Sequence, residues 1–169
     1  MTGQKTIHRR RSIRLQGFDY SKKGLYFITL CTQNRKLLFG EITDGKMELS
    51  EAGQIAHNCW IAIPDHFPTV QLEEFVIMPD HVHGIIRIIS EVNAHQTKPP
   101  KNEYGKLIRG SVGSIVKGFK IGVTKWFREQ GNQDKIWQRN YYESVIYSYE
   151  DFCRVSRYII ENPKNWRRD

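Results

Sequence analysis

Two runs of β-forming residues, separated only by Pro79-Asp80, constrain the fold of this chain more than any other feature. The first run is "VQLEEFVIM" (70–78) and the second is "HVHGIIRII" (81–89), and both are rich in β-branched residues. A proline followed by an aspartate is typical of a tight turn. The segment is therefore predicted to form a hairpin, with its two strands side by side.

The rest of the chain predicts further strands and three helices around this hairpin. Ser50 and Ser148 stand where helix N-caps are expected, and Asp151, three residues after Ser148, completes a capping box. Asp44-Gly45 is a strong two-residue hairpin signal. Strands are expected at 24–33, in the hairpin 36–49 and, with a bent start, at 135–148, and helices at 51–63 (ended by Pro64), 111–130 and 149–162 (stopped by Pro163).

The order of these elements is strand, hairpin, helix, strand, strand, helix, strand, helix. This order predicts an α+β fold that resembles the ferredoxin-like or RRM-like arrangement, an antiparallel sheet with helices on one face, followed by a C-terminal helix. A length of 169 residues fits one compact domain. We expect residues 1–17 to form a basic arm, residues 18–169 to form the domain, and residues 91–106 to form a long surface loop.

The charge balance indicates a polyanionic partner. Lys and Arg number 26 against 18 Asp and Glu, which gives a net charge of +8, and a domain this basic suits nucleic acid. Charge spread evenly over the surface would serve solubility instead, but here it is clustered. The expected DNA-contacting residues are Arg9, Arg10, Arg11 and Arg14 in the arm and Lys117, Lys120, Lys125 and Arg128 in one predicted helix.

Cysteine usage and hydropathy predict a cytoplasmic protein without a membrane segment. Cys31, Cys59 and Cys153 are odd in number and widely spaced, which favours reduced thiols over a zinc site or a disulfide framework. No apolar run approaches the ~20 residues that span a bilayer, and no signal-peptide hydrophobic segment follows the basic N-terminus.

His81 and His83 lie two residues apart on a predicted strand, so both side chains face one side and Val82 faces the other. Two neighbouring imidazoles can share a divalent metal ion, although a His-x-His pair is more often only polar surface.

Tyr158 and Asn162 are four residues apart on the last predicted helix and therefore share a face. The amide oxygen of Asn162 suits Mg²⁺ or Mn²⁺, which accept imidazole and oxygen ligands together. The alternative is that Tyr158 packs on the sheet and Asn162 only caps the helix.

Taken in order, "PDHVH", "IWQRNYYESVI" and "SRYIIENPKNW" resemble the motifs of the HUH single-tyrosine transposases, the enzymes of the smallest insertion sequences. The Tyr-x-x-x-Asn-Pro ending is closer to the branch called REP-associated tyrosine transposases. The resemblance runs from "RRRSIRLQGFDY" to "NPKNW", almost the whole chain. It implies that His81, His83 and Tyr158 are catalytic, that His81, His83 and Asn162 hold the metal, and that the C-terminal helix carries the nucleophile.

The resemblance also implies an activity and partners. The enzyme would be a metal-dependent endonuclease and strand transferase that acts on single-stranded DNA beside hairpins. It would use Mg²⁺ or Mn²⁺, and the reaction would pass through a covalent 5′-phosphotyrosine intermediate. Its DNA would include repetitive extragenic palindromes, and it would act in DNA transposition or recombination as a monomer or a homodimer in the bacterial cytoplasm, associated with the nucleoid.

Three alternatives stay open at the level of sequence. Tyr141 and Tyr142 are rival nucleophiles, but alternation along a strand puts them on opposite faces. An RRM-like module would bind nucleic acid without catalysis, although the expected RNP signature is absent. A metal-dependent phosphodiesterase would use water instead of Tyr158, and only Asp80 and perhaps Glu73 or Glu74 are carboxylates close to the histidines in sequence.

Overall fold

The computed structural model describes residues 19–90 and 108–166. The basic arm predicted at 1–17, with Arg9, Arg10, Arg11 and Arg14, and the loop predicted at 91–106 lie outside these ranges. The elements, in chain order, are β1 (Gly24–Cys31), η1 (Gln33–Arg35), β2 (Gly40–Thr43), β3 (Lys46–Leu49), α1 (Glu51–Ile61), α2 (Ile63–His66), β4 (Val70–Met78), β5 (His81–Ile88), α3 (Val112–Glu129), β6 (Tyr142–Ile146) and α4 (Tyr149–Glu161).

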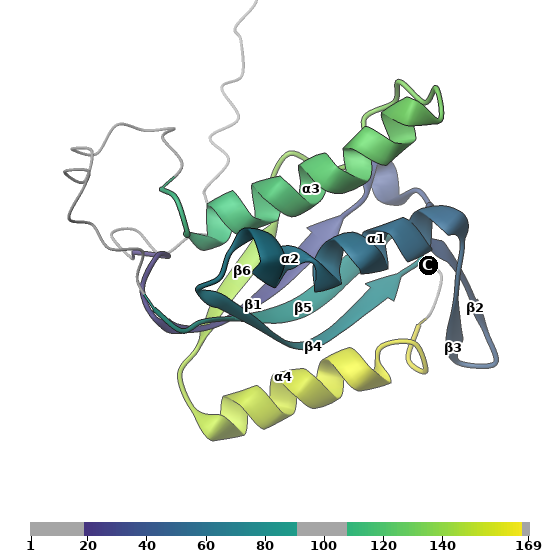
Figure 1. Cartoon of the computed structure of the whole chain (residues 1–169). Helices are drawn as coiled ribbons and strands as arrows, with labels where there is room; N and C mark the ends of the chain where they lie inside the picture. Colours follow the sequence, from purple (N-terminus) through teal and green to yellow (C-terminus); the bar gives the residue numbers. More distant parts are fainter. Residues whose placement is uncertain (1–18, 91–107, 167–169) are drawn as a thin grey trace, which may run out of the picture.

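A four-stranded antiparallel sheet with the order β4-β5-β1-β6 forms the centre of the fold, and β2 and β3 form a separate hairpin (Figure 1). β5 is paired on both sides, with β4 across the Pro79-Asp80 turn and with β1. β4 and β6 are the two edge strands. The predicted α+β class with an antiparallel sheet is confirmed.

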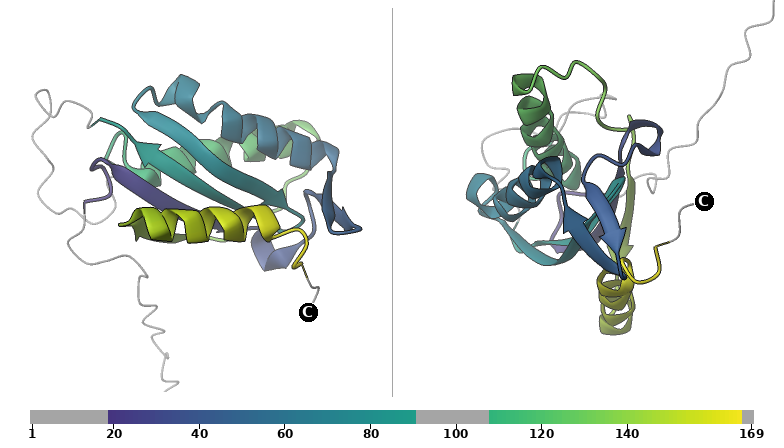
Figure 2. Two further views of the ribbon diagram at one scale, coloured as in Figure 1. Left: turned by 90° about the horizontal axis from the view of Figure 1, so that it is seen from below. Right: turned by 90° about the vertical axis from the view of Figure 1, so that its right-hand side faces the viewer.

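Helices cover both faces of this sheet. Figures 1 and 2 show α1, α2 and α3 on one face and α4 on the other. The larger apolar cluster joins Tyr26, Ile28 and Ile86 of the sheet to α1 and α3. The smaller one joins Ile85 and Ile146 to Ile159 of α4. Because side chains alternate along a strand, β5 supplies the first cluster from one face and the second from the other, so α4 packs on the face that carries His81 and His83.

The helix starts follow local signals. The Ser50 hydroxyl accepts a hydrogen bond from the Gly53 N–H at 3.1 Å, and the Ser148 hydroxyl accepts from the Asp151 N–H at 3.0 Å. Both predicted N-caps are therefore confirmed.

Several predicted boundaries are wrong. β1 ends at Cys31 and not at residue 33, and β2 begins at Gly40 and not at residue 36. The first helix ends at Ile61, and Pro64 lies in the first turn of the short α2, where a missing N–H costs nothing. The last strand is limited to Tyr142–Ile146, and Trp137 makes only an isolated bridge to Thr32. None of the helices in the described ranges is long and apolar enough to cross a membrane.

Gly84 sets the distance between α1 and the strand that carries the histidines. The Trp60 ring of α1 lies directly on Gly84, so that a Cβ at this position would overlap the indole. A glycine in a strand often marks such a close approach. The contact anchors β5 one residue after His83.

Candidate functional site

The two histidines lie side by side at the start of β5. His81 pairs with Cys31 of β1 and His83 pairs with Thr29, which fixes both imidazoles on the α4 face of the sheet. The ring centroids are 4.4 Å apart. Both residues are buried, His81 at 4% and His83 at 5% exposure. The predicted shared face is confirmed, and the interpretation of the pair as polar surface is wrong.

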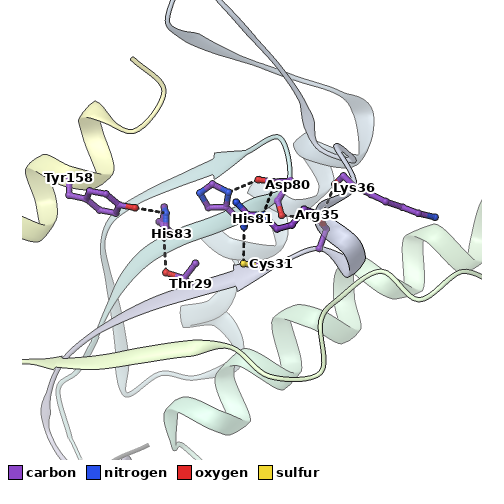
Figure 3. A network of polar contacts seen from close by, with 9 residues as sticks. Thr29, Cys31, Arg35, Lys36, Asp80, His81, His83 and Tyr158 are labelled. Atoms are coloured by element: carbon purple, nitrogen blue, oxygen red, sulfur yellow. Dashed lines mark hydrogen bonds and ion pairs between the residues drawn. The ribbon is translucent and has the colours of Figure 1, made fainter. Parts of the chain in front are cut away.

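His81 is oriented by a carboxylate. Its Nδ1 lies 2.6 Å from Oδ1 of Asp80, and Oδ2 of Asp80 lies 2.7 Å from Nε of Arg35 (Figure 3). Arg35 also donates from Nη1 to the Cys31 sulfur at 3.0 Å. Since a carboxylate oxygen accepts hydrogen bonds, Nδ1 of His81 is the donor in this contact, and Nε2 is the nitrogen that points away from Asp80. Carboxylate-bound histidines with a free second nitrogen are typical of metal ligands.

His83 is held from two sides (Figure 3). Its Nδ1 lies 2.8 Å from the Thr29 hydroxyl, and its Nε2 lies 3.2 Å from the Tyr158 hydroxyl. Burial, followed by the charges of His81 and Arg35, lowers the pKa of His83 to about 3. The ring is therefore neutral at pH 7, as a metal ligand has to be.

Tyr158 reaches the histidines from α4. Its ring meets that of Phe27 edge-on at 6.1 Å and lies 5.2 Å from the His83 ring. The residue is nevertheless 50% exposed. Ser156, on the same helix, donates to Oε2 of Glu74 on β4 at 3.0 Å, which helps to fix α4 on the sheet. The phenol is thus placed against the imidazole pair and remains accessible to a substrate.

Asn162 is the C-cap of α4, in agreement with the alternative that this residue caps the helix, and its N–H donates to the Ile159 carbonyl. Among the described residues, no hydrogen bond joins Asn162 to either imidazole. Within the described ranges there is also no group of three or more His, Cys, Asp or Glu side chains placed to hold a metal. An ion on the Nε2 atoms of His81 and His83 would need an amide, water or substrate oxygen as its next ligand, so the role of Asn162 stays a prediction.

The rival nucleophiles lie on opposite faces of the sheet, as predicted. The Tyr142 ring lies 6.1 Å from Phe27, and with Tyr158 it lines a pocket of about 440 Å³. The Tyr141 ring lies on the other face, 5.8 Å from Nζ of Lys120. Tyr142 is therefore the rival that shares a face with the histidines, and Tyr141 does not.

Several residues of the site have no signal of their own in the sequence. Thr29 reaches His83 through the pairing of β1 with β5, and Arg35, in η1 after β1, reaches Asp80. Trp166, whose ring lies 5.6 Å from that of His81, follows α4. The closeness of Asp80 to the histidines could be predicted, because Asp80 directly precedes His81 in the sequence.

The predicted basic helix residues gather away from the histidines. Lys117, Lys120, Lys125 and Arg128 line one groove on α3 together with Arg139 and Tyr141. α3 covers the face of the sheet opposite to α4 (Figure 2).

Comparison with solved structures defines the class of fold. A REP-associated tyrosine transposase bound to a REP hairpin superposes with a TM-score of 0.58 and 18% identity, over 90% of this chain and 73% of that one. At this identity the likeness shows the fold alone. This chain therefore shares the fold of that protein.

Sequence comparison gives the relatives. No protein-family model matches the chain. It is 42% identical over 167 residues to an uncharacterized protein of Haemophilus influenzae, covering 96% of this chain and 93% of that protein, and it belongs to the same family. It is also 27% identical over 151 residues to a Haemophilus influenzae protein named "Putative REP-associated tyrosine transposase", covering 86% and 73%. The sequence match and the fold together support a transposase-like, DNA-processing function.

Proposed function

We propose that this chain is a metal-dependent endonuclease and strand transferase for single-stranded DNA, with Tyr158 as the nucleophile, and that it belongs to the REP-associated branch of the tyrosine transposases. The observation that carries the proposal is the position of the Tyr158 hydroxyl, 3.2 Å from Nε2 of His83 in a buried histidine pair. A phenol, a pair of buried imidazoles and a half-open surface are the groups that a covalent attack on a phosphodiester needs.

The proposed step exchanges one ester bond for another. The Tyr158 hydroxyl loses its proton, its oxygen bonds to phosphorus, and the bond from phosphorus to the 3′-oxygen breaks. The departing 3′-oxygen takes up a proton and becomes a free hydroxyl, while the 5′-phosphate stays on Tyr158. Because the phosphotyrosine keeps the energy of the diester, a second 3′-hydroxyl can reverse the step and join strands without ATP.

The imidazoles of His81 and His83, with Asn162 as the proposed third ligand, suit Mg²⁺ or Mn²⁺. Such an ion would polarise the scissile phosphate and offset the charge that develops in the transition state. Asp80 keeps the proton of His81 on Nδ1 and so presents Nε2. Thr29 holds the ring of His83 in place.

The carboxylates near the histidines argue against a water-using phosphodiesterase. Asp80 is engaged by both His81 and Arg35. Glu73 pairs with Arg87, and Glu74 accepts from Ser156. With these groups engaged, the phenol is the group best placed to attack. An RRM-like binding module would give the buried imidazole pair no purpose.

Hairpin DNA is the proposed partner. One solved structure with a similar fold is that of a REP-associated tyrosine transposase bound to a REP hairpin, and the net charge of +8 suits a polyanion. We propose that palindromes of this type are the substrate of this chain as well, which acts as a monomer or a homodimer.

The test is cleavage of hairpin oligonucleotides taken from around the gene, with Mg²⁺ or Mn²⁺. We expect a denaturant-resistant protein–DNA adduct that Tyr158→Phe abolishes without loss of hairpin binding. Tyr149→Phe is the matched control, because it removes a phenol from the first, 80% exposed position of the same helix and should leave the adduct intact.

Other outcomes assign the reaction elsewhere. An adduct that survives Tyr158→Phe but is lost in Tyr142→Phe would move the nucleophile to β6. Metal-dependent cleavage without an adduct would favour the phosphodiesterase. Binding without cleavage under any of these conditions would favour the non-catalytic module and refute the proposal.

A further inference from the structure

A groove of about 470 Å³ lies between α3 and the segment that leads into β6. This volume falls within the ~300–1,000 Å³ that is usual for ligand sites. The floor and walls are largely apolar or aromatic, and they include Val116, Ile121 and Tyr141. The groove therefore offers a surface for the face of a flat, weakly polar group, which a site for phosphate alone would not need.

Lys120 is fixed inside this groove. Its Nζ donates to the Gln138 carbonyl at 3.0 Å and lies 5.8 Å from the ring centroids of both Trp137 and Tyr141. Burial lowers the pKa of Lys120 to about 8. The ammonium thus ties α3 to the segment before β6 and holds the Tyr141 ring at the groove wall.

The rim of the groove is basic. Lys117, Lys125, Arg128 and Arg139 are exposed there. The Lys125 ammonium has only a distant carboxylate partner, Glu129 at 3.8 Å. For Lys117 and Arg139, no ion pair is found within residues 19–90 and 108–166. An apolar floor under a cationic rim is the arrangement with which proteins bind a single strand, the bases stacking on rings and the phosphates following the cations.

The groove and the candidate catalytic site meet at one edge of the sheet. β6 is an edge strand, and it begins where the groove ends. Tyr141 lines the groove on one face, while the next residue, Tyr142, lines the pocket of Tyr158 on the other face. A strand that crosses the start of β6 can therefore contact both sites within a few nucleotides.

We propose that this groove is a second DNA-binding site, which takes an unpaired nucleotide of the strand that Tyr158 attacks: the base lies against Tyr141 and Ile121, and the adjoining phosphates contact Lys117, Lys125 and Arg139. The proposal rests on the proposed function and adds where the single strand is held and by which route it reaches the phenol. Duplex DNA would contact the rim alone, because its bases are stacked and paired.

The test measures binding of two hairpin oligonucleotides with the same stem, one blunt and one with a single-stranded extension. The full chain is used in the Tyr158→Phe background, so that no adduct forms, and fluorescence anisotropy gives the affinity. Ile121→Glu places a carboxylate in the groove at a position that is 56% exposed, which leaves the packing of α3 intact. Ile61→Glu, at a 49% exposed position of α1, is the matched control.

We expect Ile121→Glu to weaken binding of the extended hairpin by about tenfold or more, the order expected for one stacked base, and to leave the blunt hairpin within about twofold. Arg139→Gln should lower the salt dependence of binding by about one unit of slope. Ile61→Glu should change neither affinity.

Equal loss of affinity for both hairpins would overturn the inference, because it would show a general effect of charge. If Ile121→Glu binds the extended hairpin as tightly as the Tyr158→Phe parent does, the inference is overturned too. The proposed function stands in that case, provided that the wild-type chain still forms the adduct. A wild-type chain that binds neither hairpin would refute the proposed function together with the inference.

Discussion

The neutral state of buried His83 makes the stability of the fold sensitive to acid. Its pKa is lowered to about 3 by burial, then by His81 and Arg35, whereas an imidazole in the unfolded chain has a pKa of about 6.5. Between these two pKa values the unfolded chain binds a proton that the folded chain does not. The free energy of unfolding therefore falls as the pH drops below about 6.5, and the fall continues until His83 is protonated in the folded state near pH 3.

The size of the effect follows from the same two pKa values. Each pH unit between them costs about 1.4 kcal/mol. At pH 7 both states are almost fully deprotonated, and the contribution is only about 0.2 kcal/mol. At pH 5 the unfolded chain is mostly protonated at this position and the folded chain is not, so the loss is about 2 kcal/mol.

Urea unfolding of the wild-type chain and of His83→Gln, with a chelator present, measures this loss. Glutamine cannot titrate and still offers polar atoms toward Thr29 and Tyr158. We expect the wild-type chain to lose about 2 kcal/mol more than His83→Gln between pH 7 and pH 5. Carboxylates and the other histidines titrate in both proteins, so their contributions cancel in this comparison. A difference between the two proteins that stays constant from pH 7 to pH 5 would refute the reasoning, because it would mean that His83 titrates alike in the folded and unfolded chains.

Two further substitutions test how the site is positioned. Gly84→Ala should lower the free energy of unfolding by about 1–3 kcal/mol, because the added methyl group overlaps the Trp60 ring. Chemical denaturation measures this change. A variant as stable as the wild type would show that Trp60 does not hold β5 in place. Asp80→Asn should weaken Mn²⁺ binding by about 10–100-fold in calorimetric titration, because His81 loses its carboxylate partner; an unchanged affinity would show that Asp80 serves only its ion pair.

The parts of the fold that the sequence predicts well are those set by local signals. β4 occupies Val70–Met78 as predicted. Its β-forming residues indicate the strand, and the Pro79-Asp80 turn indicates where it ends. Ser50 and Ser148 mark their helix starts because a cap acts over three residues. Such signals require no knowledge of what packs above or below them.

The boundaries that were wrong depend on tertiary contacts. Trp137 is apolar and adjoins β-forming residues, which predicts a strand, but it is buried against Phe39 and Phe119 and bridges only Thr32. Burial in the core and pairing in a sheet select the same residue types. A strand pattern alone therefore cannot separate a core residue before β6 from a residue of β6.

The candidate site also has parts that local patterns predict and parts that depend on tertiary packing. Alternation along a strand placed His81 and His83 on one face, and the helix at 149–162 placed Tyr158 on one side of α4. That this side faces the histidines depends on the packing of Ile159 against Ile85 and Ile146, which no local pattern reveals. Thr29 contacts His83 through the pairing of β1 with β5, and Arg35 contacts Asp80 from η1, so both contacts join parts of the chain that are far apart in sequence.

These contacts have a consequence for the order of events at His83. Its Nδ1 is occupied by Thr29, so Nε2 is the nitrogen that remains for an ion, and Nε2 is also the atom that the Tyr158 hydroxyl contacts. Tyr158 must therefore leave this nitrogen before His83 can hold an ion. Its 50% exposure leaves room for that movement, while the Phe27 ring at 6.1 Å keeps the phenol close. If an ion occupied Nε2 of His83, the Tyr158 hydroxyl would lose this hydrogen bond and would be available to a scissile phosphate bound beside it.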